Sequence, residues 1–120
     1  MELDDLIATV SSNCQLDLAD VEATALNLGV KVPEVMDLFA RTIARRYLAG
    51  DHSYGQADMA MNQLFSFAHT VGGKGLPEFA WQAFVAFDEG EFIRDGEPLE
   101  QQGEELTKEW LGRIGLLVGA

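Results

Sequence analysis

The sequence predicts an all-α protein in which five to six short helices pack in an orthogonal or bundle-like arrangement. Apolar residues recur three and four positions apart along most of the chain, which is the spacing of amphipathic helices. No segment alternates apolar and polar residues with β-branched enrichment, so we expect no sheet. The chain has 120 residues, of which 48% are hydrophobic. This is enough apolar material for the core of a single domain over residues 1–120.

The first half of the chain predicts three helices. Apolar residues at helical spacing place the first over residues 2–12. Asp17 suits the N-cap of a second helix, and Gly29 suits its left-handed end. Pro33 fits the first turn of a third helix, where its missing N–H costs nothing, and Gly50 closes that helix.

The next two helices follow from a cap and from a dense apolar run. Ser53 and Gln56 have the spacing of a capping box, which predicts a fourth helix. A fifth helix is expected over residues 77–88, and its apolar residues occupy nearly every face. Such a helix is typical of the centre of a fold. We therefore expect it to be the most buried element, with Trp81 and Phe84 mostly shielded from water.

The C-terminal part is predicted to contain an acidic loop and one more helix. Residues 88–98 contain two glycines and a proline, which favour a loop, and the last helix is expected from about residue 99 to residue 116. The end of the chain is apolar, with Ile114, Leu116 and Leu117. If these residues pack on the core, the protein is a monomer, and if they stay exposed, a homodimer is expected to cover them.

The charge of the chain restricts its partners. It has 20 acidic and 8 basic residues and a formal net charge of −12, shared evenly between the two halves. Such a field repels nucleic acids and anionic membranes and attracts basic proteins, although the charge can also serve solubility alone. We find neither a signal-peptide pattern at the start nor a transmembrane run, and a lone cysteine suits a reducing compartment. We therefore expect a cytoplasmic protein.

No residue pattern predicts catalysis, a cofactor or a metal. Cys14, His52 and His69 have no ligand spacing among them. The acidic segment lacks the alternating oxygen ligands of a calcium loop, and residues 72–75 lack the phosphate-loop pattern. We expect a protein that is not an enzyme and has no catalytic, cofactor or metal residues.

Residues 21–40 offer an alternative function. Ala25 lies four residues before Gly29, and Val35 and Leu38 follow at the apolar positions of a helix-turn-helix. This spacing predicts a helical hairpin that could be a DNA-binding or regulatory module. The acidic start of its second helix argues against base reading, which needs donors and positive charge.

The leading hypothesis is a non-enzymatic protein-binding domain whose partner is basic, such as the target of an inhibitor. Opposite charges raise association rates and suppress wrong partners, and aromatic side chains often anchor interfaces. The acidic segment that begins at residue 88 supplies the charge. The expected contact residues are Asp88, Glu89, Glu91, Phe92, Asp95, Glu97 and Tyr54.

One stretch resembles a known kind of protein. Residues 47–58 look like a helix–turn–helix junction common in small bacterial proteins, including helical immunity proteins of the colicin D type. The resemblance implies a bacterial protein that neutralises a secreted nuclease toxin. It transfers no functional residue, because ordinary helix capping also explains the junction.

Overall fold

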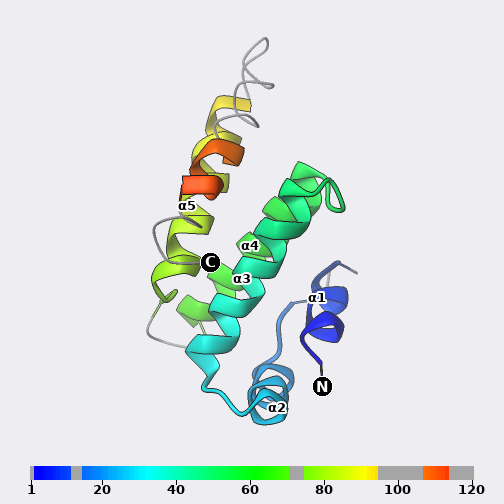
Figure 1. Cartoon of the computed structure of the whole chain (residues 1–120). Helices are drawn as coiled ribbons and strands as arrows, with labels where there is room; N and C mark the ends of the chain where they lie inside the picture. The colour runs from blue at the N-terminus through cyan, green and yellow to red at the C-terminus, as the bar shows by residue number, and fades with distance from the viewer. Residues whose placement is uncertain (1, 12–14, 71–74, 95–106, 114–120) are drawn as a thin grey trace.

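The computed structural model describes residues 2–11, 15–70, 75–94 and 107–113, with the side chains of the fifth helix described as far as Asp88. The described residues form six helices and no strand, which confirms the predicted fold class (Figure 1). The sixth helix covers residues 107–113. The others are α1 (Leu3–Ser11), α2 (Leu18–Leu28), α3 (Val32–Leu48), α4 (Tyr54–Thr70) and α5 (Glu78–Arg94).

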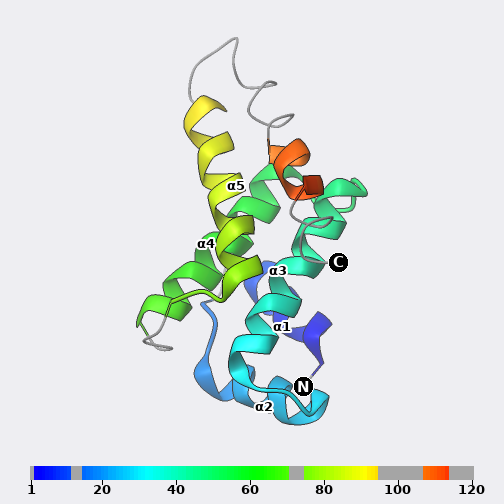
Figure 2. The same ribbon diagram turned by 60° about the vertical axis from the view of Figure 1, so that its left-hand side comes forward.

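The central element is α3, which packs against α1, α2, α4 and α5. The buried side chains of α3 recur at helical spacing and face several neighbouring helices. Phe39 and Ile43 of α3 are fully buried. Figure 2 shows α2 lying across the lower end of α3, while α4 and α5 run along its length. The expectation that the fifth helix is the central one is therefore wrong.

The turns on either side of α3 have the geometry that their glycines predict. Gly29 has a φ of 71° and Gly50 a φ of 86°, both in the left-handed region. After α2, the N–H of Val30 donates to the carbonyl of Ala25, and that of Gly29 donates to Leu26. This pair of bonds is a Schellman motif, and Gly50 ends α3 in the same way. A residue with a side chain at either position would favour a negative φ and so a different turn. The two glycine turns therefore fix where α3 begins and ends.

The caps of α2 and α4 also match the sequence. The Asp17 carboxylate accepts from the Ala19 N–H at 2.9 Å. Ser53 and Gln56 exchange two bonds: the Ser53 N–H donates to Gln56 Oε1, and the Gln56 N–H donates to Ser53 Oγ. The capping box is confirmed, and it starts α4 at Tyr54.

The prediction of a loop from residue 88 is wrong for residues 88–94, because α5 continues to Arg94. A glycine inside a helix costs about 1 kcal/mol relative to alanine, which neighbouring good helix formers can offset. Glu89 and Glu91 are such residues on either side of Gly90. The last turns of α5 extend past the ends of α3 and α4 in both views (Figures 1 and 2).

The C-terminal helix is described over residues 107–113, within the predicted range of 99–116. Its Leu111 is buried, and Trp110 packs against the core. The apolar tail residues Ile114, Leu116 and Leu117 lie outside the described residues, so the choice between a monomer and a homodimer stays a prediction.

Candidate functional surface

Three of the five acidic residues expected to bind a partner fall on α5. Asp88, Glu89 and Glu91 belong to its last two turns, and Asp88 is exposed. Acidic residues in the last turns of a helix lie at the negative end of the helix dipole, which strengthens the negative potential there. The other two predicted acids, Asp95 and Glu97, lie outside the described residues.

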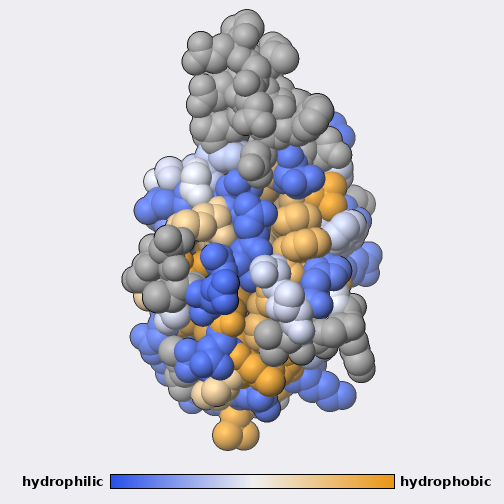
Figure 3. Space-filling model, turned by 180° about the vertical axis from the view of Figure 1, so that it is seen from behind, coloured by the Kyte–Doolittle hydropathy of each residue, from blue (hydrophilic) through white to orange (hydrophobic). Residues whose placement is uncertain are grey.

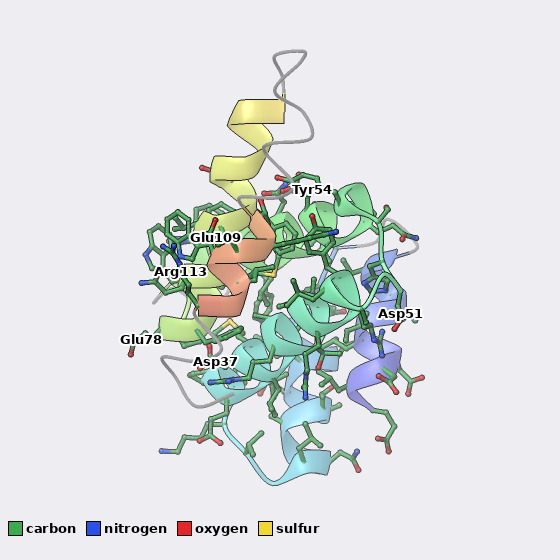
Figure 4. All side chains as sticks on the ribbon, turned by 45° about the horizontal axis from the view of Figure 1, so that its top comes forward. Asp37, Asp51, Tyr54, Glu78, Glu109 and Arg113 are labelled. Atoms are coloured by element: carbon green, nitrogen blue, oxygen red, sulfur yellow. The ribbon has the colours of Figure 1, made fainter. Side chains whose placement is uncertain are left out.

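Two hydroxyl groups hold α5 just before its acidic turns. The Tyr54 hydroxyl donates to the carbonyl of Phe87, and the Thr107 hydroxyl donates to the carbonyl of Ala86 at 3.0 Å. These donors come from α4 and from helix 107–113, so two elements fix the point at which α5 leaves the core. Figure 4 shows Tyr54 at this end of the bundle, far from Glu78 at the start of α5.

Tyr54 was expected to be an aromatic anchor on the surface, but the structure places it in the core. Its side chain is 4% exposed, and its ring lies 5.9 Å from Tyr47 and 5.6 Å from Phe87, centroid to centroid. Lys108 adds a cation 5.4 Å from the centre of the Tyr47 ring. The role of Tyr54 is therefore to support α5 from inside.

The start of α5 is fixed by α3. The Asp37 carboxylate accepts from the Ala80 N–H at 2.9 Å, which satisfies one of the free donors in the first turn of α5. The Arg41 guanidinium lies 4.3 Å above the ring of Phe79. Asp37 and Glu78 lie close to one another at this end of the molecule in Figure 4. One face of α3 thus sets the position and orientation of α5.

An aromatic cluster that the sequence did not predict lies on the surface between α4 and α5. Phe65 and Phe84 stack with centroids 4.3 Å apart and planes 11° apart. The His69 ring lies 4.2 Å from Phe65, and the Trp81 ring lies 6.0 Å from Phe84. Trp81 is 44% exposed, which corrects the expectation that it is mostly shielded from water. Phe84 is partly buried and packs against the core.

A second apolar surface lies on α2. Leu26 is 85% exposed, and Leu18 and Leu28 are each 40% exposed. In the view from behind, apolar residues are visible between hydrophilic ones in the middle of the molecule and also at its lower end, where α2 lies (Figure 3).

The packing of the second helix argues against the helix-turn-helix hypothesis for residues 21–40. Ala25 is buried and Gly29 makes the turn, as the pattern requires. However, Met36 and Ala40, which follow in the first turns of α3, are buried, and Asp37 is engaged with α5. A recognition helix needs such positions free to reach base edges.

The two histidines and the surface depression offer no catalytic set. His52 lies in the turn after α3 and His69 on α4, and Cys14 lies outside the described residues. Within the described ranges, no three His, Cys, Asp or Glu side chains are grouped to hold a metal ion. A shallow depression beside α4 has no titratable lining residue. It is lined by Gln15, Leu16, Gln63, Ser66, Phe67 and Thr70.

The His52 imidazole is the described group whose environment clearly changes its proton affinity. Burial lowers its pKa below the ordinary 6.5, and the neighbouring Arg46 charge lowers it further, while Asp51 opposes the shift. Arg46 also pairs with Asp4 of α1 at 2.6 Å. One of the charges near His52, that of Arg46, therefore also joins α3 to α1.

Comparisons of the chain with protein-family models, with curated proteins and with solved structures found no match. None of the helices in the described part of the chain has the length and hydropathy needed to cross a membrane. The function is therefore inferred from the chain's own surface.

Proposed function

We propose that this protein is a non-enzymatic binding domain for a basic protein and that the acidic end of α5 makes the first contact. An inhibitor of that protein, such as an immunity protein, is the specific form of this proposal. The observation that carries it is the continuation of α5 to Arg94, which places the acidic residues 88, 89 and 91 in the last two turns of a helix that extends past its neighbours.

The electrostatics of α5 favour a cationic partner. The last two turns of α5 contain three acidic residues, Asp88, Glu89 and Glu91, and one basic residue, Arg94. The whole chain has a net charge of −12. Negative charge near the C-terminal end of a helix raises the free energy of the unbound protein, because the helix dipole is negative there. A bound cation offsets this unfavourable interaction. Complementary charge also raises the rate of encounter, because the field extends about 8 Å at physiological salt.

The test is affinity capture with two charge variants that have the same net charge. The first reverses the acids of α5: Asp88→Lys, Glu89→Lys and Glu91→Lys. The control reverses three exposed acids elsewhere: Glu22→Lys, Glu34→Lys and Asp51→Lys. We expect the wild type and the control to capture the same basic protein, and the α5 variant to lose it.

Titration calorimetry with the purified partner then measures the affinity at low and high salt. The expected affinity falls as salt rises, because the contact is between opposite charges near the surface. A partner that is neutral or acidic would contradict the proposal. Equal loss in both variants would show that the α5 acids have no special part in binding.

The DNA-binding alternative has its own test. Fluorescence polarisation with a labelled duplex at low salt detects even non-specific binding, which depends on phosphate contacts. We expect no change in polarisation. Binding that vanishes on substitution of Arg41 and Arg45 would favour the alternative, because these residues belong to α3.

A further inference from the structure

One face of α5 carries an apolar centre between two exposed carboxylates. Glu78, Trp81, Val85 and Asp88 follow one another at steps of three, four and three residues, so they share a face of the helix. Glu78, Trp81 and Asp88 are exposed, and Val85 is half-buried. Ten residues of helix span roughly 15 Å, which is the separation of the two carboxylates along the axis.

The aromatic side chains beside this face are held before any partner arrives. Phe84 stacks on Phe65 of α4, and the Trp81 ring is tilted by 30° from the Phe84 ring, with centroids 6.0 Å apart. Binding costs less when interface side chains are already ordered, and tryptophan is the residue type most enriched among interface hot spots. The packing of α4 against α5 also makes a two-helix surface, in which the ridges of a third helix can lie.

We propose that this surface, formed by Glu78, Trp81, Phe84, Val85 and Asp88 of α5 with Phe65 of α4, binds an amphipathic helix of the basic partner. The partner helix has apolar residues at its centre and Lys or Arg about ten residues apart, one opposite Glu78 and one opposite Asp88. This inference rests on the proposed function and specifies the contact surface and the form of the partner.

Charge excludes a second copy of this chain as the occupant. An antiparallel pair of α5 helices would place Glu78 of one copy against Asp88 of the other, and a parallel pair would place each carboxylate against itself. Either arrangement brings like charges together within two molecules that each carry −12. A basic helix meets carboxylates at both ends of the same face.

The test uses the full chain and a synthetic 18-residue helical peptide with two arginines ten residues apart and leucines between them. A second peptide has glutamate in place of both arginines. Amide chemical shifts report where each peptide binds, and Trp81 fluorescence reports affinity in a Trp110→Phe background. We expect the arginine peptide to shift residues of α4 and α5 and the glutamate peptide to shift none.

Three variants define the contact. Trp81→Ala is expected to weaken binding of the arginine peptide about thirtyfold, as for an interface hot spot, measured by calorimetry because the reporter is lost. Glu78→Lys with Asp88→Lys is expected to abolish binding of the arginine peptide and to create binding of the glutamate peptide. Leu26→Ser is the control, since it removes an exposed apolar side chain from α2 and should leave binding unchanged.

The outcomes separate this inference from the proposed function. Peptide shifts on α2, or loss of binding in Leu26→Ser and not in Trp81→Ala, would overturn the inference while a captured basic partner still supported the function. A homodimer in sedimentation that Trp81→Ala dissociates would overturn it in favour of a second copy. Failure of the charge swap to transfer binding to the glutamate peptide would overturn the pairing with Glu78 and Asp88, even if Trp81→Ala were poorly folded.

Discussion

α3 and α5 have the same length, 17 residues, and lie side by side, yet one is enclosed and the other is not. α3 packs against four other helices, and seven of its residues between Val35 and Tyr47 are buried. α5 packs against α3 and α4, is contacted by helix 107–113 through Thr107, and leaves Trp81 44% exposed. The number of apolar residues in a helix therefore does not determine its burial, because its position among its neighbours limits how many faces they can cover.

α5 leaves an aromatic ring, Trp81, in contact with water, whereas the exposed large apolar side chain of α3 is Leu48, the last residue of that helix. A helix needs about one apolar stripe to attach to a core, and further apolar side chains remain in contact with water. On α5 these side chains are aromatic, stacked and bordered by carboxylates. This combination is typical of interaction surfaces, where an apolar centre is surrounded by polar residues.

The largest expected effect is the difference in the free energy of unfolding between a variant that removes a buried aromatic ring and one that removes a surface aromatic ring. Phe39→Ala on α3 should cost about 3–5 kcal/mol of the free energy of unfolding, because the fully buried ring leaves a cavity. Phe84→Ala on α5 should cost about 1–2 kcal/mol, since the ring is half-buried against Phe65. Urea unfolding measures both values. Equal costs would show that α5 is as enclosed as α3.

The next effect concerns the glycine turn that leads into α3. Gly29→Ala should cost about 1–2 kcal/mol, because φ is 71° and the added methyl meets nothing within 4 Å. The loss therefore comes from the backbone and not from a clash. Gly55→Ala is the matched control inside α4, where alanine should stabilise the helix by up to about 1 kcal/mol. A neutral result at Gly29 would mean that the turn relaxes at no cost.

Local signals in the sequence predicted most of the fold. Asp17, Gly29, Ser53 and Gln56 each satisfy backbone groups within a few residues, so a pattern of residue types is enough to recognise them. The spacing of apolar residues likewise gave α1 and α3. The extension of α5 was missed because Gly90 and the neighbouring acids resemble a loop when read alone.

The candidate surface was only partly predictable. The charge of Asp88, Glu89 and Glu91 is visible in the sequence, but the point at which α5 leaves the core is fixed by Tyr54 and Thr107, which are distant in the sequence. The exposure of Trp81 depends on how many helices reach α5, which no local pattern encodes. The apolar residues on nearly every face of α5 were the available signal, and they indicated surplus apolar surface as much as burial.

The two helices also differ in how they begin. The first turn of α3 has Pro33 and no side-chain cap, whereas that of α5 depends on Asp37 of α3. Asp37→Ala should cost about 1 kcal/mol and speed hydrogen exchange at the Ala80 amide. Asp37→Asn keeps an acceptor oxygen and should retain most of the stability. If exchange at Ala80 is unchanged in Asp37→Ala, water or another group replaces the cap.

The smallest expected effect lies in the turn that ends α3, where His52 is half-buried. Burial and Arg46 lower the pKa of His52 below 6.5, so the unfolded chain takes up a proton at a higher pH than the folded protein does. The contribution of the neutral ring to stability is therefore present above about pH 6.5 and is lost as pH falls through the folded pKa. Protonation would also put an N–H on the buried Nδ1, which has no hydrogen-bond partner in the described part of the chain.

We expect the melting temperature of the wild type to fall more than that of His52→Gln between pH 7.5 and 5.5. Because the carboxylates are common to both proteins, their titration cancels in this difference. An equal fall in the two proteins would show that the turn tolerates the charged ring.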